Sequence, residues 1–121
     1  MSEVIVYPSA ARTATPTAVD LNLEQFNCNA LLLLIDVTAV GVTPSVVPTI
    51  DGIDVASGKT FNLLTGAALT AIVTRTLRVG PGLVVAANLA ANDYTPEQVR
   101  ITMTHGNGVT ITYSVTAHLI Q

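Results

Sequence analysis

The clearest pattern in the chain is an alternation of apolar and polar residues near its C-terminal end. From Val109 to Leu119 every second side chain is apolar, and those between are threonine, serine or histidine. Successive side chains of a β-strand point to opposite faces, so a period of two gives one apolar and one polar face. A helix would spread both sets around its circumference. The pattern predicts a strand over residues 109–119 and places Tyr113 in the core.

A second alternating segment lies just upstream and predicts a partner for this strand. Residues 99–104 repeat the pattern, and His105-Gly106-Asn107-Gly108 separates the two segments. An Asn-Gly pair readily supplies the positive φ angles of a tight hairpin turn. We therefore expect the two strands to form an antiparallel hairpin.

Other segments have strand patterns bounded by turn residues. Residues 46–50 contain Pro48, which cannot donate to a ladder, so this strand is expected at a sheet edge. Arg75 shares a face with apolar side chains of residues 69–79, which indicates a bulge or a face that becomes an interface near its end. The run 30–35 is interpreted as a strand buried on both faces. The remaining expected strands are residues 3–7, 17–23, 31–40 and 59–64, with turns at Asp51-Gly52 and Ser57-Gly58.

These segments amount to roughly seven or eight strands, a number typical of a sandwich or barrel. Residues 83–91 and 95–98 also fit short helices, but among so many strands we expect them to be irregular crossings. No repeat or linker divides the chain, and 121 residues suit one domain. We therefore expect an all-β fold, a single antiparallel β-sandwich of jelly-roll type over residues 1–121, with residues 1–16 as an N-terminal arm or an edge strand.

Composition narrows the class of protein further. Half of the chain is apolar, 4% is aromatic and 11% is charged, whereas globular domains are about 25% charged. This composition excludes a disordered chain and a long solvated helix or coiled coil. A surface of threonine and alanine with few charges is poorly protected against association. We therefore expect the protein to sit against copies of itself or against a partner.

The charge pattern argues against nucleic acid and membranes as partners. The net charge is −3 and the pI is about 5.0. Nucleic-acid binding needs clustered Lys and Arg, and an anionic membrane surface attracts the same clusters. The cations here are scattered along the chain: Arg12, Lys59, Arg75, Arg78 and Arg100.

Cys28 is the single cysteine, so no internal disulfide can form and the fold must depend on its core. A reduced cytosolic origin fits this, as does a particle assembled in a cytosol and later released. We interpret Cys28 as a small, half-buried hydrophobe. No signal peptide is recognisable, and no apolar run approaches the roughly 20 residues of a membrane helix.

The residues available for chemistry are few. Residues 52–60 end in Gly-Lys-Thr like a phosphate-binding loop, but five residues separate the glycines where that loop has four. Asp51 and Asp54 lack the oxygen spacing of a calcium loop and fit turn caps better. His105 and His118 have no identifiable third ligand and are expected to be solvated. With no nucleophile motif either, we expect no enzyme, no metal and no cofactor.

Five side chains are candidates for interface contacts, because Tyr and Arg are enriched in interface hot spots. Tyr7 and Tyr94 lie close to prolines in expected strand ends or loops. Peripheral packing is an equal alternative for both tyrosines. The full candidate set is Tyr7, Arg12, Arg75, Arg78 and Tyr94.

Segments along nearly the whole chain, taken in order, resemble a family of small virion structural proteins of tailed bacteriophages. The similar segments are residues 7–13, 34–40, 43–46, 51–54, 56–59, 63–64, 77–79, 81–82, 100–105 and 111–115. No single motif among them is specific, and the resemblance rests on their succession. Gly80 stands where members of the family commonly carry an aromatic residue. If that aromatic residue is a contact in the family, the docking of this chain is expected to differ from theirs.

The resemblance implies a non-enzymatic part of a phage particle, a head decoration or minor capsid protein. It implies a location in the virion after assembly in the host cytoplasm. The expected partners are further copies of the chain, as a dimer or trimer, and the major capsid protein. Strand edges and residues 7–13 are the expected docking surfaces. The alternative is a tail-associated or glycan-binding β-module, which needs a concave site lined by exposed aromatic and polar groups.

Overall fold

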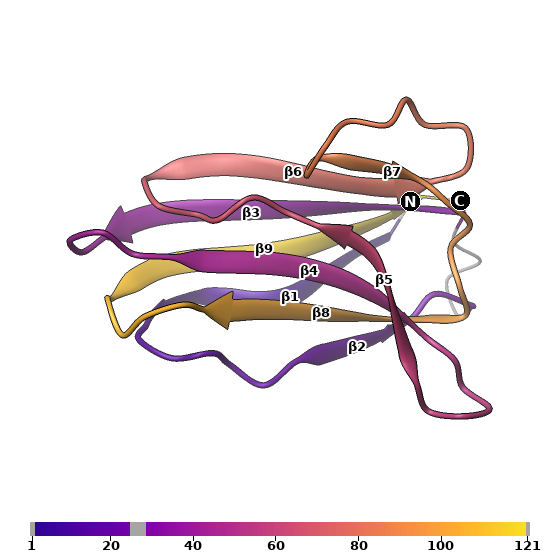
Figure 1. The fold of residues 1–121 in the computed structure, drawn as a ribbon, viewed down its shortest axis with the longest axis horizontal. Coiled ribbons are helices and arrows are strands. Elements are labelled where there is room, and N and C mark those ends of the chain that lie inside the picture. Colours follow the sequence, from indigo (N-terminus) through magenta and orange to yellow (C-terminus); the bar gives the residue numbers. More distant parts are fainter. Residues whose placement is uncertain (1, 25–28, 121) are drawn as a thin grey trace.

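The computed structural model describes residues 2–24 and 29–120, which form two layers of β-strands (Figure 1). The segments with strong apolar and polar alternation form strands, and the described residues contain no α-helix. The strands are β1 (Ser2–Arg12), β2 (Val19–Asn22), β3 (Ala30–Val40), β4 (Val46–Ile53), β5 (Thr60–Thr65), β6 (Val73–Gly80), β7 (Ala90–Asn92), β8 (Gln98–His105) and β9 (Ile111–Ile120).

The strands pair in a nested order that identifies the topology. The first sheet has the order β1-β9-β3-β6-β7, and the second has the order β2-β8-β4-β5. The antiparallel pairs are thus β1 with β9, β2 with β8, β3 with β6 and β4 with β5. Such nesting describes one long hairpin rolled into two sheets, which is the jelly-roll arrangement. The expected jelly-roll-like sandwich is confirmed, with the short β7 added in parallel beside β6.

The core lies between the sheets and is built from the apolar half of each alternation. Burial of an aliphatic side chain contributes about 1.5–3 kcal/mol, so this layer is the main source of stability. The cluster includes buried residues of both sheets. As predicted, the inward residues of β9 are fully buried: Ile111, Tyr113, Val115, Ala117 and Leu119.

β3 is an inner strand of the first sheet, between β9 and β6. Leu31 and Leu33 face the core and are buried, whereas Leu32 and Leu34 face outward and are only half-buried. The prediction that residues 30–35 are buried on both faces is therefore wrong. The sandwich has two layers, so the outer face of each sheet is open to solvent.

The expected hairpin between β8 and β9 does not form. β8 pairs with β2 and β4, whereas β9 pairs with β1 and β3, so the connection crosses from one sheet to the other. Neither Asn107 nor Gly108 has a positive φ. Instead, the Asn107 side chain donates to the Thr43 carbonyl (3.0 Å) and accepts from the Val109 amide (3.2 Å). The need to bury the apolar faces of both strands in opposite layers overrides the local turn preference.

β4 is an inner strand between β8 and β5, so the prediction that Pro48 marks a sheet edge is wrong. The Pro48 carbonyl accepts a hydrogen bond from the Gly66 amide (2.8 Å). The nitrogen and carbonyl of one strand residue point to the same side, so the proline nitrogen also faces the side of β5. β5 ends at Thr65. The missing donor therefore falls beyond the end of the β4–β5 ladder.

The two turns expected at Asp51-Gly52 and Ser57-Gly58 have different outcomes. Asp51-Gly52 lies within β4, so the prediction of a turn there is wrong. The Phe61 ring lies across this position, and a Cβ added to Gly52 would be 2.4 Å from two ring carbons. Glycine thus makes room for the ring. Ser57-Gly58 does form a turn, with a φ of +75° at Gly58.

No bulge precedes Arg75 in β6. The pairing of β6 with β3 is continuous over residues 31–37 and 73–79, so the bulge interpretation is wrong. Arg75 lies half-buried on the inner face, where its guanidinium donates to the Ala67 carbonyl (2.8 Å). The inner face of β6 therefore reaches the rim of the sandwich at this residue.

Residues Ser2–Arg12 form an edge strand and not a separate arm. β1 lies at the end of the first sheet, beside β9. Its register shifts between Ile5 and Tyr7 and again between Tyr7 and Ala10, and Pro8 lies in the second irregular part. Irregularity and proline both hinder the pairing of an exposed edge with a further strand.

The segments that were ambiguous in sequence are irregular apart from β7, as expected. Residues 81–89 form a loop between β6 and β7. Cys28, interpreted above as half-buried, lies outside the described residues. Within the described part of the chain, no helix is both long and apolar enough to cross a membrane.

Candidate functional site

Tyr7, one of the candidate interface residues, lies in the core. Its side chain is 5% exposed. The hydroxyl donates to the Thr17 carbonyl (2.7 Å) and lies 3.3 Å from the Ile101 carbonyl in the other sheet. Burial raises the pKa of Tyr7, so the hydroxyl remains a donor. Tyr7 therefore connects the edge of one sheet to the other instead of offering its ring to a partner.

Arg12 packs against two tyrosine rings at the end of β1. Its guanidinium carbon lies 4.6 Å from the centroid of the Tyr113 ring and 5.6 Å from that of Tyr7, within the range of a cation–π interaction. Its nitrogens donate to the carbonyls of Pro8 (2.6 Å), Ala10 (3.2 Å) and Tyr113 (2.8 Å). Arg12 thus satisfies carbonyls along the irregular part of β1.

His105 extends this contact network at the end of β8. Its Nε2 atom lies 3.0 Å from the Tyr113 hydroxyl, while its buried Nδ1 atom has no hydrogen-bond partner among the described residues. Burial, with a smaller effect of the Arg12 charge, lowers the pKa of His105. Burial raises the pKa of Tyr113 to about 12. A neutral imidazole and a neutral phenol therefore share this hydrogen bond.

Tyr7, Arg12, His105 and Tyr113 together form what we term the inter-sheet cluster. Their contacts fix β1 and β9 of the first sheet against β8 of the second. The expectation that both histidines are solvated is wrong for His105, whereas His118 is half-exposed on the outer face of β9. The cluster is best explained as a structural link between the two layers.

The other candidate interface residues lie near the opposite edge of the first sheet. Arg78 is exposed on the outer face of β6, and Tyr94 is 81% exposed between β7 and β8. Arg75 is engaged in part by the Ala67 carbonyl. Arg78 and Tyr94 are thus available to a partner, while Tyr7 and Arg12 belong to the inter-sheet cluster.

Large apolar side chains are exposed together on the loop of residues 81–89, the β6–β7 loop. Val84, Val85 and Leu89 are 89%, 68% and 45% exposed. Figure 1 shows this loop projecting beyond the β6–β7 edge of the first sheet. The Ala86 carbonyl accepts hydrogen bonds from the amides of Leu89 (3.0 Å) and Ala90 (2.9 Å). These hydrogen bonds close a turn over residues 86–90, directly after Val84 and Val85.

A groove of about 430 Å³ separates the β6–β7 loop from β5. β5 and β7 are edge strands of the two sheets, so the groove lies where both layers end. Its walls are residues 62–65 on one side and residues 85–88 and 90–92 on the other. Exposed apolar side chains and two strand edges thus meet in one region.

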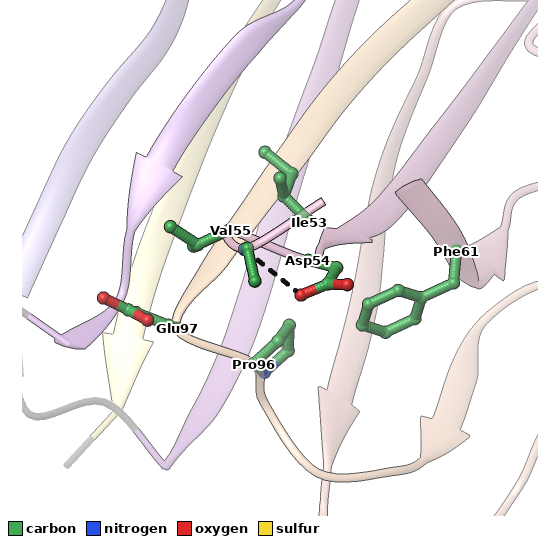
Figure 2. Close-up of a pocket in the computed structure, with 7 residues that line it drawn as sticks. Ile53, Asp54, Val55, Phe61, Pro96 and Glu97 are labelled. Carbon is green, nitrogen blue, oxygen red and sulfur yellow. Dashed lines mark hydrogen bonds between the residues drawn. The ribbon is translucent and has the colours of Figure 1, made fainter. Parts of the chain in front are cut away.

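A second groove, of about 580 Å³, lies at the opposite end of β5. Figure 2 shows the ring of Phe61 reaching toward Asp54, with Pro96 across the groove and the carboxylate of Glu97 directed away from the ring. Phe61 is 46% exposed. The Asp54 carboxylate accepts hydrogen bonds from the backbone amide two residues on (3.3 Å) and from the Ser57 hydroxyl (2.7 Å). Asp54 thus caps the turn, as expected.

No group of three or more His, Cys, Asp or Glu side chains within the described ranges could hold a metal ion. The sequence pattern predicts only an irregular crossing over residues 83–91 and does not identify the apolar β6–β7 loop as an exposed surface. The signal was there in Val84, Val85 and Leu89, which are apolar but follow no period of two. An apolar segment without periodicity, directly after Gly80-Pro81-Gly82, fits an exposed loop better than a core element.

Comparison with protein-family models, with curated proteins and with solved structures finds no match to this chain. No relative therefore supplies a function. The resemblance expected from the sequence thus has no counterpart in these comparisons, and the surfaces of the chain itself have to carry a proposal about its function.

Proposed function

We propose that this protein is a non-enzymatic structural component of a tailed-phage particle, which decorates the head and stabilises the capsid. Its partner is the major capsid protein, and its location is the virion after assembly in the host cytoplasm. The succession of segments that resemble small virion proteins supports the proposal. The nested strand order supports it as well, because viral capsid proteins use the jelly-roll architecture.

The observation that carries the proposal is the exposed apolar β6–β7 loop. Val84, Val85 and Leu89 are exposed on one loop, and hydrogen bonds close a turn over residues 86–90 within it. Contiguous apolar surface commonly marks an interaction site. A segment already closed by hydrogen bonds also loses little conformational entropy on binding. We therefore assign this loop as the surface that docks on the capsid.

The geometry favours this loop over the N-terminal segment that the sequence suggested. Arg12 already engages the carbonyls of Pro8 and Ala10, and the register of β1 is irregular there. A regular row of free N–H and C=O groups is what strand addition needs. Residues 7–13 are therefore a weaker docking surface than residues 81–89.

Decoration acts mechanically in this proposal. One loop with a few apolar side chains makes a modest contact. A capsid repeats the same site many times, and any decoration protein that joins its own copies binds several sites at once. Stabilisation of the shell then comes from the number of contacts and not from the strength of one.

Binding to capsids tests the proposal directly. Heads of the phage whose genome encodes this chain, prepared without the protein, are mixed with purified variants and sedimented. Val84→Asp should weaken co-sedimentation at least about tenfold, since it introduces a charge into an apolar contact. Val42→Asp is the matched control, because Val42 is 83% exposed on the β3–β4 loop. Native protein that does not bind, or Val84→Asp that binds like native, contradicts the proposal.

A glycan-binding role at the phage tail is the second candidate, and Phe61 favours it. The half-exposed Phe61 ring lines an open groove, and a few aromatic and polar groups in a concave site are what a glycan needs. Saturable binding on a glycan array that Phe61→Ala abolishes and Val84→Asp retains would promote this role. If no glycan on the array binds saturably, the glycan-binding role is excluded.

A further inference from the structure

The outer face of the first sheet has an apolar centre that the fold leaves uncovered. Leu32 and Leu34 of β3 are half-buried there, and Ile5 of β1 is 68% exposed. The strand registers set Ile5, Thr116, Leu34 and Thr76 side by side across β1, β9, β3 and β6. No charged residue interrupts these four positions, which we term the apolar row.

The neighbouring row on the same face carries a charge at each end. The registers align Glu3 of β1, His118 of β9, Leu32 of β3 and Arg78 of β6. Glu3 and Arg78 are both exposed, and neither joins an ion pair within the described residues. A negative charge thus lies on one rim and a positive charge on the other. If a second copy faces this row with its own row running in the opposite order, Glu3 of each copy lies against Arg78 of the other.

We propose that a second copy of this chain covers this face, through a two-fold axis parallel to the strands and between β9 and β3. This axis sets β1 opposite β6 of the other copy, and β9 opposite its β3. Packed sheets keep their strands within about 30° of each other and lie about 10 Å apart. A glutamate and an arginine that extend toward each other span this gap. The dimer therefore contains the pair of Glu3 with the partner's Arg78 twice.

The same axis packs the apolar row on itself. Leu34 lies opposite the partner's Thr116, and Ile5 lies opposite the partner's Thr76. A long aliphatic side chain then always meets a short threonine, which lets the two faces interdigitate. The half-buried leucines and Ile5 lose their remaining contact with water, which favours the pairing.

The outer face of the second sheet does not offer this arrangement. There the Arg100 guanidinium already binds both oxygens of Asp20 (2.7 and 3.1 Å). Asp51 accepts a hydrogen bond from the Asn62 amide group (3.0 Å). The charges of that face are satisfied within one copy, so they contribute little to a symmetric pair.

The dimer goes beyond the proposed role in a phage and does not depend on it. The β6–β7 loop projects past the edge of the first sheet (Figure 1) and lies outside both rows. Two loops therefore remain exposed in the dimer. A bivalent protein of this kind would engage two sites of a lattice.

Analytical ultracentrifugation over a concentration series tests the dimer. Native protein should sediment as a monomer–dimer equilibrium. Glu3→Arg and Arg78→Glu each create two like-charge contacts and should weaken dimerisation at least about tenfold. The double variant restores opposite charges and should dimerise like native. Lys59→Glu is the matched control for Arg78→Glu, since it changes net charge equally on an exposed residue outside the face.

The inference is overturned by native protein that is monomeric throughout, by a closed trimer, by single reversals that dimerise like native, or by a double variant that does not recover. Leu34→Glu, which places charge in the apolar row, must also weaken the dimer. Circular dichroism and chemical unfolding verify that each variant is folded. If a strictly monomeric protein binds capsids, the proposed function stands and the dimer is excluded. The two proposals can therefore fail independently.

Discussion

The Nε2 atom of His105 lies 3.0 Å from the hydroxyl of Tyr113, and this contact joins the last residue of β8 to the third residue of β9. The two strands lie in different sheets, so no backbone ladder connects them. A part-buried side-chain hydrogen bond at the end of β8 thus links the two layers. The inter-sheet cluster is where stability should respond most clearly to single polar substitutions.

The free energy of unfolding is expected to fall as the pH is lowered through about 6.5. Burial lowers the pKa of His105 in the folded protein from 6.5. The unfolded chain therefore takes up the proton first, and protonation favours unfolding. The neutral His105 contributes fully to the free energy of unfolding above pH 6.5, and this contribution is lost as the pH falls toward the pKa of His105 in the folded protein. Urea unfolding at neutral and at mildly acidic pH measures this change in the free energy of unfolding.

His105→Gln should lose most of this pH dependence. The hydrogen bond with Arg100 lowers the pKa of Asp20 from 3.8. The protonation of Asp20 therefore changes the free energy of unfolding in a separate pH range, below pH 3.8. A His105→Gln protein with the native pH profile would contradict the role assigned to this residue.

Arg12→Met should lower the free energy of unfolding by about 2–3 kcal/mol, because it removes hydrogen bonds to three carbonyls and the contact with two aromatic rings. Methionine keeps the apolar stem, so most of the packing survives. Lys59→Met, at an exposed residue of the β4–β5 connection, should change the free energy of unfolding by no more than about 0.5 kcal/mol. Denaturant unfolding at one protein concentration compares them, and equal effects would contradict this account of Arg12.

Gly52→Ala should destabilise the protein by about 1 kcal/mol, because its Cβ would lie 2.4 Å from Phe61 ring carbons. The half-exposed ring can move aside, but only by giving up its contact with β4. Phe61→Ala removes the obstacle, so the double variant should be more stable than the two single effects predict. Gly108→Ala is the control, since no heavy atom lies within 4 Å of a Cβ added there. An additive double-mutant cycle would rule out the steric explanation.

Thr43→Asn should raise the free energy of unfolding by about 1 kcal/mol. Thr43 has a φ of 51°, a left-handed conformation that β-branched residues adopt at a cost and asparagine adopts readily. The Thr43 carbonyl keeps its hydrogen bond from Asn107, which does not involve the threonine side chain. Thr104→Asn, in the extended backbone of β8, should not stabilise the protein. Thermal unfolding of both variants measures the two effects, and a Thr43→Asn protein that is no more stable than native would contradict the prediction.

The strands were predictable from the sequence, but their pairing was not. A period of two marks β3, β8 and β9 because each has one face in the core. Partner choice depends on which layer each strand joins, and that is decided by contacts distant in sequence. Asn107-Gly108 is a strong local signal for a hairpin, yet here the chain crosses between layers. Pro48 is acceptable inside a sheet because β5 ends before reaching it.

The candidate site was harder to predict than the fold. Tyr113 follows the alternation of β9 and was placed in the core correctly. A regular period of two would place Tyr7 on the same outer face as Ile5, but the register shift between these residues turns Tyr7 inward. The β6–β7 loop has no periodicity at all, so its exposure follows only from the three-dimensional arrangement.

A reconstruction of the phage particle at a resolution that shows side chains tests the central claim most directly. The account predicts a two-layered β-sandwich on the outside of the head, with Val84 and Val85 buried against the major capsid protein. A particle that lacks the chain, or one that holds it with the β6–β7 loop facing solvent, would contradict the account.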